Sequence, residues 1–193
     1  MESIIIRSVN ARELDALVKI SRQTFHETFS EVNTEENMNR YLDESLSQGK
    51  LQAELENENS EFYFAVQITE KDFAKENRTE EEINSAELPE QIIGYLKLNF
   101  GDAQTELKND QAIEIERIYV LKEFHGKKVG QLLYNKAIEL AKERNADFVW
   151  LGVWEENHKA INFYKKNGFL EFDQHKFVLG DDEQTDLMMK LKL

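Results

Sequence analysis

The chain has 193 residues, of which 40% are hydrophobic, and this is enough apolar material for one domain with a single core. Its 38 acidic residues outnumber its 24 basic ones. The resulting formal charge of -14 argues against nucleic acid or an anionic membrane surface as a partner and permits a cationic small molecule.

The sequence contains no cysteine, which excludes disulfides, thiolate metal sites and a covalent acyl-cysteine intermediate. The apolar run in MESIIIRSVN is too short for a signal peptide, and nowhere do about 18 apolar residues follow one another, as a spanning helix requires. We therefore expect a cytoplasmic protein with no membrane partner. The histidines show no spacing typical of ligands, so we expect no metal site: His26, His125, His158 and His175.

The N-terminal part predicts a strand at residues 4–7 and then two helices. Asn10 is a suitable N-cap for the first helix, which carries apolar residues on one stripe from Leu14 to Phe29. Thr34 begins the second helix, which extends to Leu46. Alternating apolar and polar residues then predict strands at residues 61–68 and 91–100.

Residues 69–90 separate these two strands and hold eight acidic residues, three basic residues and the only proline. Because they have almost no apolar pattern, we expect a mobile acidic insertion between paired strands. The rest of the chain shows no boundary, and we expect a single domain over residues 1–193.

The central stretch IEIERIYVLKEFHGKKVG predicts a strand at residues 113–121 that leads through a turn into a helix. Gly126 and Gly130 let the backbone approach a ligand, and the first amides of the helix attract anions such as phosphate. An ordinary turn and helix cap explain the two glycines equally well. The P-loop and Gly-x-Gly-x-x-Gly fingerprints are both absent.

The C-terminal part predicts a strand at residues 148–154, a short helix ending at Gly168, and a hairpin of strands at 169–179 and 187–193. The acidic residues of the intervening turn GDDEQTD are either solvated or part of an electrostatic funnel for a polycation: Asp181, Asp182, Glu183 and Asp186.

The order of strand, HGKKVG, helix, strand, Asn157-x-x-Ala160-x-x-Phe163-Tyr164 and Gly168-Phe169 resembles the GCN5-related N-acetyltransferase (GNAT) family over nearly the whole chain. This resemblance implies an α+β fold, with a mixed, mostly antiparallel sheet of six to seven strands flanked by helices and with splayed central strands. It also implies acetyl-CoA as cosubstrate. The chain departs from the family's Gln/Arg-x-x-Gly-x-Gly/Ala loop at His125 and Lys128, which weakens the signature.

The stretches IERIYV, WLGVWE, NFYKK and GDDEQTDLMMK are similar to the PaiA-type spermidine/spermine N-acetyltransferases of bacteria within that family. We therefore expect direct transfer of an acetyl group to a primary amine, with a polyamine as acceptor. A peptide or protein amine is an alternative acceptor, and a regulatory protein that binds acetyl-CoA but acts through a partner is an alternative function. Expected partners are thus a small-molecule amine, with a homodimer left open, and no nucleic acid.

The resemblance also suggests roles for individual residues. Tyr164 would protonate the leaving thiolate, and Glu116 would accept the proton of the ammonium through water, unless it is instead paired with a basic neighbour. Glu114 and Glu116 should face the same side of their strand as Ile118 and Val120 unless a bulge intervenes.

The remaining candidates fall into two groups. Residues expected to bind acetyl-CoA are Ile118, Tyr119, Val120, His125, Gly126, Lys127, Lys128, Val129, Gly130, Asn157 and Tyr164. Residues expected to contact the acceptor, with a solvated helix face as the alternative for those on the first helices, are His26, Glu27, Glu31, Tyr41 and Trp154. Trp150 is expected in the core.

Overall fold

The computed structural model describes residues 3–68, 91–179 and 181–193, so the predicted insertion at 69–90 lies outside the described residues. The strands are β1 (Ser3–Ser8), β2 (Ser60–Ile68), β3 (Gln91–Phe100), β4 (Ala112–Val120), β5 (Phe148–Trp154), β6 (Leu170–Leu179) and β7 (Asp182–Lys192). The α-helices are α1 (Leu14–Phe29), α2 (Glu35–Ser45), α3 (Gln48–Leu55), α6 (Val129–Glu143) and α7 (His158–Lys166).

The strands form one seven-stranded sheet in the order β1-β2-β3-β4-β5-β7-β6. Neighbouring strands are antiparallel except for β4 and β5, which are parallel. The register between β4 and β5 covers only residues 112–114 and 148–150, and beyond these the two strands separate. The expected mixed, mostly antiparallel sheet with splayed central strands is thereby confirmed.

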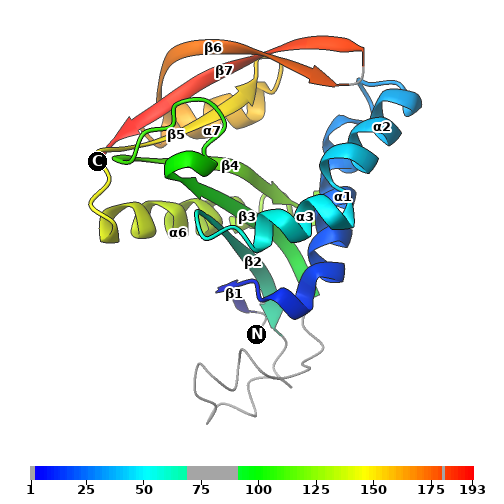
Figure 1. Ribbon diagram of the computed structural model, residues 1–193, viewed down its shortest axis with the longest axis horizontal. Helices are drawn as coiled ribbons and strands as arrows, with labels where there is room; N and C mark the ends of the chain where they lie inside the picture. Colours follow the sequence, from blue (N-terminus) through cyan, green and yellow to red (C-terminus); the bar gives the residue numbers. More distant parts are fainter. Residues whose placement is uncertain (1–2, 69–90, 180) are drawn as a thin grey trace.

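Helices cover both sides of this sheet, with α1 on one side and α6 on the other (Figure 1). Local capping explains where they begin. Asn10 forms a capping box with Glu13 in the 3-10 turn before α1, Thr34 caps α2, and Asn157 caps α7. The sequence pattern did not predict α3, which buries only Leu51 and therefore has almost no apolar periodicity.

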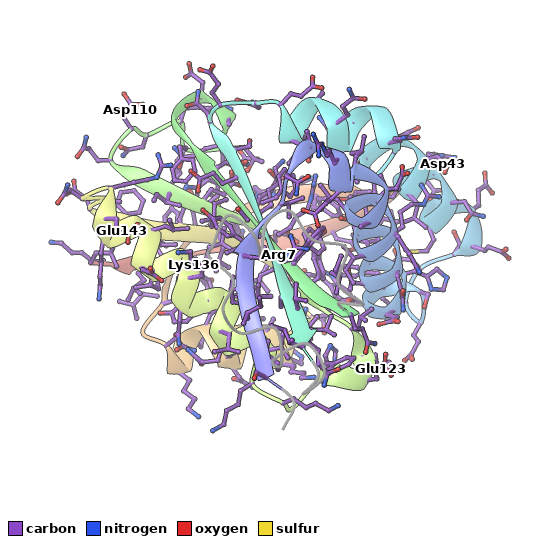
Figure 2. All side chains as sticks on the ribbon, turned by 90° about the horizontal axis from the view of Figure 1, so that it is seen from below. Arg7, Asp43, Asp110, Glu123, Lys136 and Glu143 are labelled. Atoms are coloured by element: carbon purple, nitrogen blue, oxygen red, sulfur yellow. The ribbon has the colours of Figure 1, made fainter. Side chains whose placement is uncertain are left out.

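The core lies between the sheet and the helices, where large side chains such as Phe64, Leu98 and Phe169 are almost fully buried. Many of the acidic residues behind the net charge are on the outside, and Figure 2 shows Asp43 and Glu143 directed away from the body of the molecule. Within the described ranges, no helix is long and apolar enough to cross a membrane.

The C-terminal hairpin differs from its predicted form. β7 begins at Asp182, so most of the predicted turn GDDEQTD belongs to a strand that pairs with β6 from Leu179 to Leu170. These polar residues form a strand because one of its faces lines a cavity instead of the core. The hairpin extends to α2 (Figure 1), where Asn37 Nδ2 donates to Asp181 Oδ1 at 2.6 Å.

Candidate active site

Two cavities open where β4 and β5 separate, and they meet. The first, here called the loop cavity, has a volume of about 560 Å³ and lies against the turn before α6. The second, the inner cavity, has a volume of about 360 Å³ and lies between β4, β5, the hairpin and the first two helices. The residues that line both cavities are Ile118, Tyr119, Asn157, Ala160 and Tyr164.

The turn HGKKVG gives the loop cavity a backbone surface. Gly126 has φ of 82° and Lys128, the residue before α6, has φ of 65° in the left-handed region. A glycine adopts this conformation without steric cost, which explains physically why the resembled loop pattern places glycine at the position of Lys128. A Cβ added at Gly130 would meet no atom within 4 Å, so the cavity side of this residue is open.

The charge of the loop cavity suits an anion. Lys122, Lys128 and Lys159 line it, and the first amides of α6, at Val129 and Gly130, lie at its wall. Lys127 is different, because its ammonium lies 4.3 Å from the centre of the Phe124 ring and the residue does not line the cavity.

His125 ties the end of β4 to α7. Its Nδ1 lies 3.2 Å from Lys159 Nζ, and its Nε2 lies 2.9 Å from the Val120 carbonyl oxygen. Because an ammonium only donates, Nδ1 accepts, and the Nε2 proton is donated to the carbonyl. His125 therefore positions Lys159 at the loop cavity as well as lining it.

Aromatic side chains form much of the inner cavity. Phe25 and Tyr41 are stacked with ring centres 4.2 Å apart, and the ring centres of Phe29 and Trp154 are 6.1 Å apart. Of the predicted acceptor contacts, Tyr41 and Trp154 line this cavity. Trp150 is fully buried as expected, although it reaches the cavity wall, and its indole N–H donates to Gln104 Oε1 at 2.7 Å.

The other predicted acceptor contacts lie elsewhere. His26 is exposed and lines neither cavity. Glu27 lines the loop cavity instead, where it accepts a hydrogen bond from the Lys122 amide at 2.7 Å. Glu31 is exposed and pairs with Lys122 Nζ at 3.1 Å. The interpretation of a solvated helix face fits His26, and Glu31 is a solvated residue of the turn that follows α1.

Glu116 sits in a group of four charged side chains. Its carboxylate lies 2.6 Å from Lys97 Nζ and 2.8 Å from Arg117 Nη2, and Glu54 of α3 pairs with the same two cations. Burial acts to raise the pKa of Glu116, but Arg117 and Lys97 outweigh it and hold that pKa below its usual range. This geometry corresponds to the alternative interpretation of Glu116 as a glutamate paired with basic neighbours.

A β-bulge explains this pairing. Lys97 is opposite Arg117 while Leu98 is opposite Ile115, so Glu116 is an extra residue in β4. Glu116 and Arg117 consequently face the same side, and Tyr119, not Ile118, follows them on that side. The sequence prediction allowed for a bulge, and this bulge places Glu114 and Glu116 on the opposite face of β4 from Ile118 and Val120.

Glu114 is almost fully buried beside this group and accepts hydrogen bonds from Asn99 and from the Thr105 amide at 2.9 and 2.8 Å. Burial raises the pKa of Glu114, and these hydrogen bonds only partly oppose it. Glu114 lines the inner cavity, so this cavity holds a carboxyl group that is more easily protonated than Glu116.

Two further polar residues line the inner cavity: His175 of β6, which sequence reasoning missed, and Asp186 of β7, which it left open as either a solvated turn residue or part of an electrostatic funnel. They are directly opposite each other in the hairpin, and His175 Nε2 lies 4.0 Å from Asp186 Oδ2. The acidic run GDDEQTD was the available signal, but only the register of β7 shows that Asp186 faces inward.

Tyr164 stands at the junction of the cavities. It is 6% exposed, and burial raises the pKa of its hydroxyl, so the hydroxyl keeps its proton at neutral pH. Asn157 caps α7, the helix that carries Tyr164, because its side-chain oxygen accepts a hydrogen bond from the Ala160 amide at 3.1 Å.

Comparisons with known proteins agree with this geometry. The model of the acetyltransferase (GNAT) family matches residues 22–169. An uncharacterized N-acetyltransferase in the pepI 3' region of Lactobacillus delbrueckii subsp. lactis is 36% identical over 193 residues, which cover 100% of this chain and 99% of the relative.

Solved structures share the fold. The PaiA N-acetyltransferase of Thermoplasma acidophilum, in complex with coenzyme A, has a TM-score of 0.71 at 23% identity, covering 99% of both chains. A probable acetyltransferase of Staphylococcus epidermidis has a TM-score of 0.69 at 18% identity, covering 98% of this chain and 99% of that one. The family match over most of the chain and the relative of equal length show that this chain belongs to the GNAT family of N-acetyltransferases.

Proposed function

We propose that the protein transfers the acetyl group of acetyl-CoA directly to a primary amine, and that this amine is a polyamine such as spermidine or spermine. The observation that carries the proposal is the junction of a basic cavity and a carboxylate-rich aromatic cavity at Tyr164. A thioester held at that junction would face an acceptor in the inner cavity.

The loop cavity fits the coenzyme. The open Cβ positions of Gly126 and Gly130 leave room for a pyrophosphate close to the backbone, and Lys128 and Lys159 supply opposite charge. The separated edge of β4 from Ile118 to Val120 can pair with the amides of the pantetheine arm as an added strand would.

Direct transfer is the simplest chemistry for this chain, since it has no cysteine to carry an acyl group. The acceptor must first lose a proton, because an aliphatic ammonium has a reference pKa near 10.4. Its nitrogen then attacks the thioester carbon, the carbon–sulfur bond breaks, and the thiolate takes a proton from the Tyr164 hydroxyl. The proton that the nitrogen loses as the amide forms restores this hydroxyl, directly or through water. Glu116 remains a candidate proton acceptor, but its ion pairs make it a weak base.

The polyamine part of the proposal is supported by similarity in sequence to the PaiA-type enzymes and by the charges of the inner cavity. Arg117 and Lys176 are its cationic lining residues, whereas the carboxyl groups that line it are Glu106, Glu114, Glu116 and Asp186. The structural likeness to the Thermoplasma PaiA protein, at 23% identity, supports the fold alone.

The test is steady release of free coenzyme A thiol from acetyl-CoA with a panel of amines at low and high salt. We expect spermidine and spermine to be better acceptors than monoamines and lysine peptides, and their advantage to shrink as salt screens the charges. If peptides or uncharged amines were better at both salt concentrations, the polyamine acceptor would be wrong. If no amine released thiol above background while acetyl-CoA still bound, the regulatory alternative would be favoured.

A further inference from the structure

We propose that Asp186 and His175 form the subsite that holds an ammonium group of the acceptor. This inference rests on the proposed function and adds the residues that recognise the cation. Both residues line the inner cavity, and neither belongs to the charged group around Glu116.

The register of three strands turns both side chains into the cavity. Asp186 is opposite Trp154 of β5 on one side and opposite His175 of β6 on the other. Directly opposite residues of antiparallel strands project to the same face. That face also carries Phe177, whose ring centre lies 5.8 Å from that of Tyr41 on α2, so it is the face turned to the N-terminal helices.

Gly152 of β5 makes room for this pair. A Cβ at Gly152 would lie 3.3 Å from His175 Cε1 and 3.5 Å from Asp186 Oδ2. An alanine there would require the imidazole to give by a few tenths of an ångström, and a longer side chain would displace the imidazole or the carboxylate. The two side chains therefore occupy the space that a side chain at residue 152 would fill.

The spacing of the pair suits a bridging ammonium. His175 Nε2 and Asp186 Oδ2 are 4.0 Å apart, too far for a direct hydrogen bond. An ammonium nitrogen that lies to one side of the line joining these two atoms can be about 2.9 Å from both, which is the usual length of such hydrogen bonds. An ammonium has three donors and no acceptor, which matches a carboxylate oxygen and an imidazole lone pair.

The surroundings favour a cation over a neutral ligand. Burial raises the pKa of Asp186, and the nearby Glu155 adds to this increase while His175 opposes it. A positively charged ligand would therefore stabilise the ionised carboxylate of Asp186. The adjacent walls carry Tyr41, Phe29 and Trp154, and aromatic faces attract ammonium groups.

Glu116 does not offer a comparable charge. Its group holds two carboxylates, Glu54 and Glu116, and two cations, Lys97 and Arg117, so the charges cancel. The carboxylate of Asp186 lies 4.0 Å from His175 Nε2, beyond hydrogen-bond distance, and a neutral imidazole leaves its negative charge available to a ligand.

The experiment compares Asp186→Asn and His175→Gln with the control Asp173→Asn, which removes the same charge from an exposed residue of β6 that does not line the inner cavity. For Asp186→Asn we expect the KM for spermidine to rise about 10-fold to 100-fold, the range for losing a hydrogen bond to a charged group. The KM for acetyl-CoA should stay unchanged. His175→Gln should show a smaller rise, and Asp186→Glu should recover part of the loss.

A binding measurement separates this inference from the proposed function. Spermidine alone should raise the melting temperature of the wild type and of Asp173→Asn, but not of Asp186→Asn. That pattern supports the subsite even if no acetyl transfer occurs, in which case only the proposed function fails. An unchanged KM in Asp186→Asn, an equal melting shift in all variants, or no shift in the wild type would each overturn the subsite.

Discussion

The carboxylate of Glu116 lies 2.6 Å from the ammonium of Lys97, and both side chains are largely buried. The contact exists because the bulge in β4 places Glu116 and Arg117 opposite the single residue Lys97. Glu54 links this group to α3, so it joins the central sheet to the N-terminal helices that wall the inner cavity.

Replacing Glu116 by glutamine should lower the free energy of unfolding by about 2 to 3 kcal/mol at neutral pH, somewhat less than for an isolated buried pair because Glu54 remains. The pKa of Glu116 is lowered in the folded state, so its contribution is present above the unfolded value of 4.5 and is lost as the pH falls through the folded pKa. The difference from the wild type should therefore shrink in acid.

Denaturant titrations from pH 7 down to about pH 2 measure this difference, because its loss is expected below the unfolded pKa of 4.5. Glu36→Gln is the control, since Glu36 also pairs with an arginine but its side chain is 84% exposed, and we expect no measurable change. A loss in Glu116→Gln that stayed constant down to about pH 2 would show that packing, not charge, is responsible.

A bulky residue at position 130 should block the coenzyme. Acetyl-CoA at 100 times its Kd should stabilise the wild type by about 2.7 kcal/mol, and Gly130→Leu should abolish this because the leucine would enter the loop cavity. Gly49→Leu is a matched control, since Gly49 is likewise the second residue of a helix with nothing within 4 Å of an added Cβ. A full melting shift in both variants would refute the loop assignment.

Local sequence patterns predicted most of the strands and helices that surround the site. The strand expected at 91–100 coincides with β3, and the expected turn before α6 is present, because apolar alternation and glycine are local signals. The helix α3 was missed, since Leu51 alone is buried on it and an isolated apolar residue has no period.

The parts of the site that depend on pairing between strands could not be predicted. Whether Glu116 faces Lys97 depends on a bulge that only the register with β3 defines. Likewise, Asp186 faces inward only because β7 begins at Asp182 and pairs with both β5 and β6. The resemblance to a family pointed to Tyr164, which lines both cavities, but it could not show that Tyr41 lines the inner cavity and that His26 does not.

Tyr164→Phe should lower kcat about 100-fold or more and leave acetyl-CoA affinity nearly unchanged, because the hydroxyl acts mainly when the thiolate departs. Tyr134→Phe is the control, since Tyr134 is also buried but lines neither cavity. Steady-state kinetics with a melting-shift measurement of acetyl-CoA binding gives both numbers. Equal kcat in Tyr164→Phe and the wild type would mean that another group protonates the thiolate.

Asp186→Asn should make the free protein more stable at neutral pH, although it weakens the proposed ammonium subsite. The pKa of Asp186 is raised in the folded state, chiefly by burial, so the ionised carboxylate costs stability above the folded pKa. Below the unfolded value of 3.8 both states are protonated and this cost disappears. The gain from asparagine should consequently be constant above the folded pKa and decrease as the pH falls through that pKa toward 3.8.

Melting temperatures of the wild type, Asp186→Asn and Asp173→Asn between pH 8 and pH 4 test the effect. Asp173→Asn should follow the wild type, because Asp173 is exposed. A loss of stability in Asp186→Asn at pH 8 would show that contacts within the protein already stabilise the carboxylate. Higher stability of Asp186→Asn at pH 8, combined with a higher KM for spermidine, is expected of a buried charge that an ammonium ligand neutralises. The buried carboxylate destabilises the free protein, and binding of the ammonium removes this destabilisation.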